Sequence, residues 1–154
     1  MAKQISRDGF GLAQTHRTLP IALLRAREAV MEQFRPLLAA NDVTEQQWRV
    51  MRVLEEVEKI DASRLATLAC ILAPSLTRIM KTLESRGFIR AHKDEHDGRR
   101  TLVALTEAGR DFIRALAPES AAIYSEIETK IGRARIEALL DELEVLLSQL
   151  KVDG

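Results

Sequence analysis

The sequence of 154 residues predicts a mainly α-helical protein that carries one small β-hairpin. Three observations support this fold class. Apolar residues recur at helical spacing over most of the chain. Aromatic residues make up only 4% of a sequence that is 46% hydrophobic, so the core must consist mostly of aliphatic side chains, as in helical proteins. Two short segments with strand character, residues 88–93 and 101–105, flank a polar loop with a turn-forming Asp97-Gly98 pair.

The length fits one domain over residues 1–154, and the charge is unevenly distributed within it. Lysine plus arginine and aspartate plus glutamate number 23 each. From Arg78 to Arg100, however, seven basic residues face four acidic ones, and from Glu107 to Leu150 five face nine. A basic middle and an acidic end favour a protein that presents one face to nucleic acid.

Targeting signals and covalent cross-links are not expected. The single cysteine excludes an intramolecular disulfide. The first ten residues lack the apolar run of a signal peptide, and no stretch of 18 apolar residues occurs in the sequence. We therefore expect a cytoplasmic protein with no membrane partner.

Residues 1–18 are polar and are expected to form a flexible N-terminus, followed by a helix over residues 19–40. Pro36 falls within the last turns of that helix and predicts a kink or an early end. Thr44 and Gln47 form a capping box that opens a second helix, which runs to about Val57.

The segment from Pro74 to Gly87 has the features of one complete helix. Proline suits the first turn, and glycine suits the left-handed position after the last turn. Four apolar residues form one buried stripe: Leu76, Ile79, Met80 and Leu83. The opposite face carries hydroxyls and basic groups from Ser75, Thr77, Arg78, Lys81, Thr82 and Ser85. Such a face can approach a polyanion and offer hydrogen-bond donors to base edges.

The hairpin strengthens this interpretation because Arg99 and Arg100 lie at its tip. A short helix over residues 63–69, the helix that starts at Pro74 and a basic β-ribbon together predict a winged helix-turn-helix over residues 44–105. The tip arginines are expected to contact the minor groove, where the negative potential is concentrated. The alternative is a small α+β domain with a solvated basic hairpin, and the order of the three elements makes it the weaker one.

The terminal helices, residues 19–40 and 106–151, are expected to form a dimer. Thr106 caps the second of these segments, Pro118 is expected to bend it, and Gly132 interrupts it. Its last helix carries an aliphatic row formed by Ile136, Leu139, Leu140, Leu143, Leu147 and Leu150. These stripes exceed what one small domain needs to bury, which favours a homodimer.

With these elements in place, the chain resembles the MarR family of transcriptional regulators from about Leu19 to Leu150. The motifs that carry the resemblance are Asp97-Gly-Arg99 and Leu105-Thr-Glu-Ala-Gly109. Three further stretches, Ile21–Glu28, Val43–Arg49 and Ala69–Thr77, resemble the regulators of homoprotocatechuate (4-hydroxyphenylacetate) degradation operons. The resemblance implies a homodimeric repressor on a pseudo-palindromic double-stranded DNA operator, released by a small aromatic acid such as 4-hydroxyphenylacetate or 3,4-dihydroxyphenylacetate.

The resemblance also assigns residues. Those that match recognition-helix positions are Pro74, Ser75, Thr77, Arg78 and Lys81, and those that match the wing are Asp97 and Arg99. Asp97 would orient an arginine, because a carboxylate repels phosphate. A carboxylate effector near the first helix would bind a guanidinium. The candidates are Arg17, Arg25 and Arg27, with Trp48 and Cys70 as possible walls, and a structural ion pair is an equal alternative for each arginine.

The sequence gives less support to other functions. Cys70 could sense oxidation, but its apolar sequence context favours a buried, unreactive thiol. His92 and His96 lie in a hairpin without further ligands, so neither a metal site nor a cofactor is expected. The sequence has no nucleophile motif or phosphate-binding loop, so an enzyme is not expected. A dimeric interaction module that binds no DNA would leave the basic hairpin unexplained, and a response to another small molecule stays open.

Overall fold

The computed structural model describes residues 15–150, and the chain divides into two compact units, residues 1–36 and 37–154. Each unit is described by itself. The described part of the first unit contains a 3₁₀-helix, Thr15–Arg17, and helix α1, Leu19–Glu32. Residues 1–14 of the expected flexible N-terminus lie outside the described residues, and residues 15–17 form a helical turn.

The helix expected over residues 19–40 is divided into α1 and a short helix α2, Arg35–Ala40. The last turn of α1 tightens, since Gln33 N–H donates to Val30 O at 3.1 Å and Phe34 N–H donates to Met31 O at 3.0 Å. Pro36 is the cause, because it has no N–H for the carbonyl of Glu32 and its ring would clash with that carbonyl. Of the two outcomes that Pro36 predicted, the early end is therefore the one observed.

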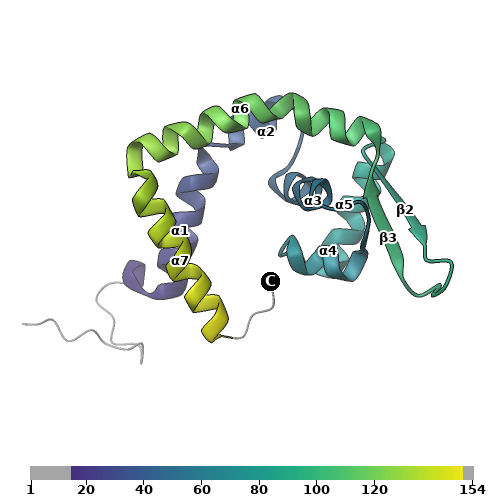
Figure 1. Ribbon diagram of the computed structural model, residues 1–154, viewed down its shortest axis with the longest axis horizontal. Coiled ribbons are helices and arrows are strands. Elements are labelled where there is room, and N and C mark those ends of the chain that lie inside the picture. Colours follow the sequence, from purple (N-terminus) through teal and green to yellow (C-terminus); the bar gives the residue numbers. More distant parts are fainter. Residues whose placement is uncertain (1–14, 151–154) are drawn as a thin grey trace, which may run out of the picture. The chain divides into compact units, whose positions relative to one another are not determined.

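The second unit contains the remaining helices and strands (Figure 1). They are α3 Glu45–Glu55, β1 Ile60–Asp61, α4 Ala62–Leu68, α5 Ala73–Ser85, β2 Ile89–Lys93, β3 Thr101–Leu105, α6 Glu107–Ile131 and α7 Arg133–Gln149. The predicted capping box of α3 is confirmed: Gln47 N–H donates to the Thr44 hydroxyl at 3.1 Å, and Thr44 N–H donates to the Gln47 side chain at 3.1 Å. The predicted fold class, mainly helical with a small β-hairpin wing, is confirmed.

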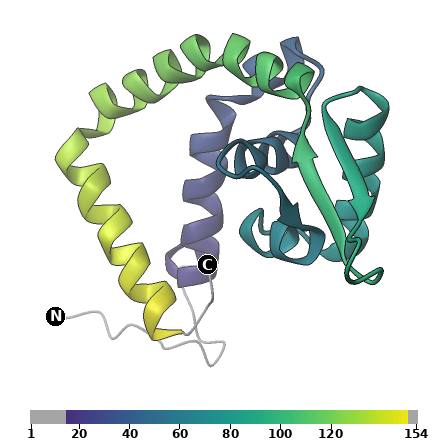
Figure 2. The same cartoon turned by 45° about the vertical axis from the view of Figure 1, so that its right-hand side comes forward.

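Strands β2 and β3 form the predicted antiparallel hairpin, in which Ile89 lies opposite Leu105 and Lys93 lies opposite Thr101 (Figure 2). A third strand, β1, pairs with the other edge of β3, so that the order is β1-β3-β2. The sequence predicted no strand at residues 60–61. Two residues are too few to show an alternating pattern, so the strand is set by its pairing with β3 rather than by a local signal.

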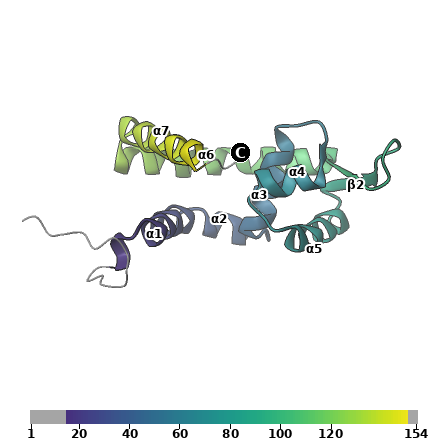
Figure 3. The same cartoon turned by 90° about the horizontal axis from the view of Figure 1, so that it is seen from below.

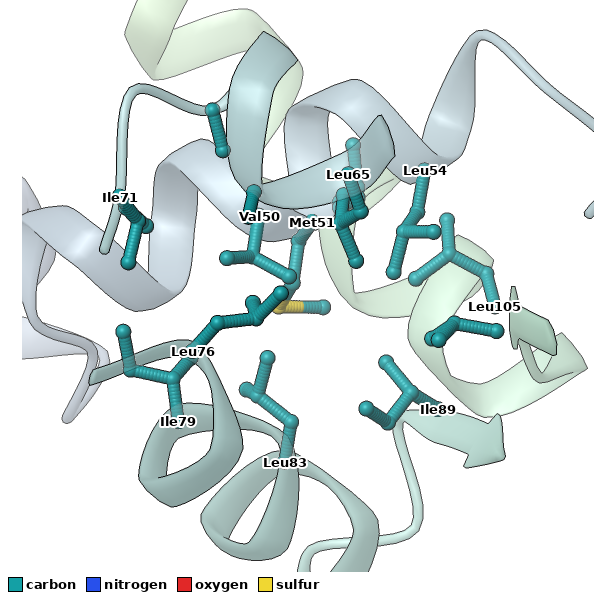
Figure 4. Close-up of a cluster of buried hydrophobic side chains, with 14 residues drawn as sticks. Val50, Met51, Leu54, Leu65, Ile71, Leu76, Ile79, Leu83, Ile89 and Leu105 are labelled. Carbon is teal, nitrogen blue, oxygen red and sulfur yellow. The ribbon is translucent and has the colours of Figure 1, made fainter. Parts of the chain in front are cut away.

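The core of the second unit lies between α3, α4, α5, the sheet and the first turns of α6. Leu76, Ile79 and Leu83 of α5 point into it, toward residues of α3 such as Met51 (Figure 4). The buried stripe predicted for α5 is thus confirmed at three positions, while Met80 is half-buried at its edge. We call residues 43–116 the winged lobe, because the buried residues of this unit from Val43 onward end at Leu116.

The C-terminal end of α5 is fixed to its surroundings. At its C-terminal end Gly87 adopts the predicted left-handed backbone, with φ 78°. The Thr106 hydroxyl donates to Gly87 O at 2.5 Å and accepts the N–H of Gly109 at 3.1 Å, so the predicted cap of α6 also holds the end of α5. The Arg86 guanidinium donates to the carbonyls of Asn41 and Asp42. These contacts set the direction in which α5 projects its outer face.

Candidate nucleic-acid interface

Helix α5 lies along one edge of the winged lobe, and the β2–β3 hairpin projects beyond it (Figure 3). On its outer face Pro74, Thr77, Arg78 and Lys81 are exposed, and Ser75 is half-buried. The Thr77 hydroxyl donates to Ala73 O at 3.1 Å, which leaves its oxygen free to accept a further hydrogen bond. The structure therefore brings the five residues predicted from α5 onto one helix that faces away from the core.

The tip of the hairpin is a loop closed by two backbone hydrogen bonds. Arg100 N–H donates to Asp97 O at 3.0 Å, and Asp94 N–H donates to Arg100 O at 3.0 Å. The Asp97 carboxylate accepts the backbone N–H of Arg99 at 3.0 Å and lies 3.4 Å from its Nε. The Arg99 side chain is 94% exposed. Asp97 therefore lies where it can orient Arg99, and the Arg99 guanidinium stands clear of the lobe.

Arg100, although adjacent to Arg99, has different surroundings. Its Nε donates to the Asp61 carboxylate at 2.9 Å, and Nη1 lies 3.5 Å from the Asp94 carboxylate. Asp61 also caps α4, because its Oδ1 accepts the N–H of Ser63 at 2.7 Å and that of Arg64 at 3.3 Å. Asp61 was not among the site residues predicted from the sequence. An Asp directly before a short helix is a capping signal, but the contact with Arg100 spans 39 residues and has no local signature.

The charges of this cluster stabilise one another. The hydrogen bond from Arg100 lowers the pKa of Asp61 against the opposing effect of burial, and the backbone N–H groups of Ser63 and Arg64 lower it further. The same hydrogen bond raises the pKa of Arg100, with smaller contributions from the carboxylates of Asp94 and Asp97. Each member of these ion pairs favours the charged form of its partner.

The residues predicted to bind an effector are divided between the two units. In the first unit, Arg17 and Arg25 line a shallow hollow of about 450 Å³. The other residues lining this hollow are His16, Ala22 and Ala26. Arg27 is not among the lining residues, and its guanidinium lies 3.6 Å from the Glu28 carboxylate. The pKa of Glu28 is lowered mainly by its hydrogen bond with Arg35, at 2.6 Å.

Trp48 and Cys70 belong to the second unit. Trp48 is half-buried against the core of the winged lobe. The prediction of a buried thiol was wrong, because Cys70 is exposed. Its backbone is left-handed, with φ 55°, in the turn between α4 and α5, and this conformation directs the side chain outward although Ala69 and Ile71 beside it are buried.

The aliphatic row predicted for the last helix is only partly covered by the described residues, with Ile136 and Leu143 half-buried. None of residues 133–149 is buried. Leu139, Leu140 and Leu150 are each at least half exposed. We call the row formed by Ile136, Leu139, Leu140, Leu143, Leu147 and Leu150 the α7 seam. Within residues 15–150, no helix is long and apolar enough to cross a membrane, and no group of three or more His, Cys, Asp or Glu residues is placed to hold a metal ion.

Comparison with known proteins gives related sequences over most of the chain. A model of the MarR family matches residues 43–101. The transcriptional regulator FarR of Neisseria gonorrhoeae is 40% identical over 85% of this chain and 90% of its own length. The homoprotocatechuate degradative operon repressor of Escherichia coli is 37% identical over 86% of this chain and 90% of its own length.

Solved structures of transcriptional regulators are also similar to this chain. NadR in complex with 4-hydroxyphenylacetate is 40% identical and superposes with a TM-score of 0.75, covering 86% of this chain and 94% of NadR. The transcriptional repressor CouR, bound to a 23-mer DNA duplex, is 27% identical and also has a TM-score of 0.75, covering 88% of this chain and 97% of CouR.

Proposed function

Because this chain belongs to the MarR family of transcriptional regulators, we propose that it is a homodimeric repressor of an aromatic-acid catabolic operon. Each subunit binds one half of a pseudo-palindromic operator, and a phenolic acid such as 4-hydroxyphenylacetate or 3,4-dihydroxyphenylacetate releases the dimer. Family membership places the chain among DNA-binding regulators rather than enzymes.

The observation that carries the proposal is the pairing of α5 with an exposed arginine on the adjoining hairpin. In the proposed complex α5 enters the major groove, where Ser75, Thr77, Arg78 and Lys81 contact bases and phosphates. Pro74 starts the helix at the groove. Arg99 reaches into the minor groove, held by Asp97. That CouR was solved on a DNA duplex supports this arrangement.

The α7 seam supports the homodimer. An isolated chain would expose these leucines to water at a cost of roughly 25 cal/mol for each Å² of apolar surface, and a second copy of the seam would remove that exposure. In a dimer of this kind the two α5 helices must reach half-sites about 34–36 Å apart, one turn of DNA. The α7 seam is thus proposed to determine the spacing of the DNA-binding helices.

The effector is proposed from the relatives and from the hollow in the first unit. NadR was solved with 4-hydroxyphenylacetate, and the Escherichia coli relative represses homoprotocatechuate degradation. In this chain the hollow beside α1 offers the guanidinium groups of Arg17 and Arg25 next to two alanines. Guanidinium groups bind a carboxylate in a bidentate manner, and the alanines leave room for a ring.

Release requires that the effector bind the DNA-free form more tightly than the DNA-bound form. The coupling is reciprocal, so operator DNA must weaken effector binding by the same factor by which the effector weakens DNA binding. We expect a factor of roughly 5 to 150, the usual range for such coupling.

The experiment that tests the proposal is a gel-shift titration of the purified protein on the DNA upstream of its own gene. It is run in about 150 mM salt with excess nonspecific DNA, because phosphate contacts alone give salt-dependent binding to any sequence. A specific complex that either acid dissociates is the expected result. Absence of any specific complex would contradict DNA recognition. A complex that both acids leave intact, at concentrations that saturate the protein, would contradict the effector.

The arginines of the hollow can be tested separately from DNA binding. Arg25→Gln is expected to weaken the response to the acid by at least tenfold, since a carboxylate loses a charge-assisted hydrogen bond. Its affinity for the operator without effector should stay within about twofold, because α1 carries none of the proposed DNA contacts. Arg27→Gln is the matched control, since Arg27 lies on the same helix but does not line the hollow. Equal effects of the two substitutions would contradict the assignment.

A second candidate signal is oxidation at Cys70, which its exposure favours. The thiol lies in the turn that leads into α5, so an oxidised and enlarged side chain there would disturb the approach to DNA. Hydrogen peroxide should then release the wild-type protein from the operator but leave Cys70→Ser bound. Equal behaviour of the two proteins would exclude this signal.

A further inference from the structure

Two arginines stand side by side at the tip of the hairpin, and their surroundings differ. The Arg99 side chain is 94% exposed and its ion pair is with Asp97, two residues away on the same loop. The Arg100 side chain is 51% exposed, and its partners lie on both sides of the loop base: Asp94 at the end of β2, and Asp61 in β1. Only the second arrangement joins the hairpin to a different part of the lobe.

Asp61 makes two kinds of contact with its two carboxylate oxygens. Oδ1 accepts the first N–H groups of α4, and Oδ2 accepts the Arg100 Nε. Its backbone pairs with Leu102 of β3. One residue therefore connects the start of the first helix of the helix-turn-helix with the base of the hairpin loop. The Asp61 side chain is 21% exposed, so this ion pair is better shielded from solvent than that of Arg99 with Asp97, whose side chain is 38% exposed.

The hairpin needs such a connection at this end. Strands β2 and β3 pair from Ile89–Leu105 to Lys93–Thr101, and β1 supports β3 at Leu102 and Val103. The Lys93–Thr101 pair is followed by the loop of residues 94–100, which carries Arg99 and which no strand of the described residues covers. A hairpin with two strands is only marginally stable where it leaves the rest of the sheet. The ion pairs of Arg100 lie at this point of departure.

We propose that Asp61, Arg100 and Asp94 form a clasp that positions the wing against α4, and that Arg100 is a positioning residue while Arg99 makes the DNA contact. The inference rests on the proposed DNA-binding function and divides the two tip arginines between two roles. The clasp holds the loop in the orientation from which Arg99 reaches the groove. Its loss lets the tip move, which weakens binding to the operator without removing a phosphate contact.

Asp61→Asn is the most informative variant. Asparagine is as good a helix cap as aspartate, so the bonds to Ser63 and Arg64 can be retained while the charge facing Arg100 is removed. We expect operator affinity to fall about fivefold, the upper end for a single partly exposed ion pair. Arg100→Gln is expected to have a similar effect. Each variant is checked by circular dichroism, and its melting temperature should confirm that it is folded at the assay temperature.

The salt dependence of binding separates positioning from contact. If Arg100 contacts phosphate, Arg100→Gln lowers the slope of log affinity against log salt concentration by about one. If Arg100 only positions the loop, the slope stays as in the wild type, whereas Arg99→Gln lowers it. Arg90→Gln controls for the loss of one charge, because Arg90 is an exposed residue of the same hairpin outside the clasp.

A double-mutant cycle completes the test. With a clasp, Asp61→Asn combined with Arg100→Gln costs no more operator affinity than Arg100→Gln alone, because that change already removes the contact with Asp61. Additive losses, or a lowered salt slope for Arg100→Gln, would overturn the proposal. So would wild-type affinity in both single variants. A wild-type protein that binds no operator specifically would instead refute the underlying DNA-binding function, so the two failures are distinguishable.

Discussion

The winged lobe and helix α7 are both rich in leucine, but they use it in opposite ways. In the lobe, Leu54, Leu65 and Leu83 have no exposed surface. In α7 none of residues 133–149 is buried, although the helix carries the α7 seam. The lobe buries its apolar residues within one chain, whereas α7 leaves them at the surface. Leucine-rich helices thus occur in both regions, and only burial shows which helix belongs to a core and which keeps its leucines at the surface.

The first prediction compares a leucine from each region. Leu65→Ala should lower the free energy of unfolding by about 2–5 kcal/mol, because it leaves a cavity in a packed core. Leu139→Ala, at a position 55% exposed in the α7 seam, should change the stability of the monomer by no more than about 0.5 kcal/mol. Urea unfolding at several protein concentrations measures the first effect, and sedimentation measures the weakened dimer in the second. Equal losses of stability at every concentration would mean that the seam belongs to the chain's own core.

The second prediction concerns the close approach of α6 to the hairpin. A Cβ at Gly109 would lie 2.2 Å from the backbone oxygen of Phe88, which no side-chain movement can relieve. Gly109→Ala should therefore cost about 1–3 kcal/mol of stability, as overpacked positions do. The matched control is Gly98→Ala in the wing loop, where a Cβ meets nothing within 4 Å and no positive φ is required. Equal melting temperatures for the two variants would contradict the contact.

Where the sequence predicted the structure correctly, the signals were local. Pro74, Gly87 and the spacing of Leu76, Ile79 and Leu83 define α5, and Thr106 defines the start of α6. Each such signal lies within a few residues of the feature that it determines, so it can be read without knowing the fold. The hydroxyl and basic face of α5 was predictable for the same reason, since a helix that buries one stripe must expose the other.

Where the sequence analysis failed, the determining contacts were distant or depended on backbone conformation. The partner of Arg100 is 39 residues away, and strand β1 exists only through its pairing with β3. The exposure of Cys70 follows from a left-handed turn, while its apolar neighbours suggested burial. Neither α4 nor α5 signals the conformation of the turn between them, because a non-glycine residue with positive φ is uncommon.

The third prediction concerns how the N-terminal end of α5 contributes to the stability of the protein. Leu72 stands at its N-cap, where leucine cannot accept the free N–H groups of the first turn, and it is 79% exposed. Leu72→Ser should supply the missing acceptor and raise the free energy of unfolding by about 1 kcal/mol. Chemical unfolding measures this gain, and Leu72→Ala, which removes the side chain without adding an acceptor, is the control. If serine gives no more stability than alanine, the start of α5 is satisfied in another way.

The smallest effect is expected from the charge of the clasp, because its groups lie at the surface rather than in a core. The pKa of Asp61 is lowered in the folded chain, chiefly by the hydrogen bond from Arg100, with the backbone N–H groups of Ser63 and Arg64 adding to it. A carboxylate of lowered pKa contributes stability above its unfolded pKa of about 3.9 and loses that contribution as the pH falls through the folded value. Wild type should therefore melt above Asp61→Asn at neutral pH, and the difference should shrink below about pH 4. If the difference in melting temperature between the two proteins is the same at neutral pH and at pH 3, the Asp61 charge adds no stability. The Asp61 side chain then stabilises α4 only as much as a neutral cap would.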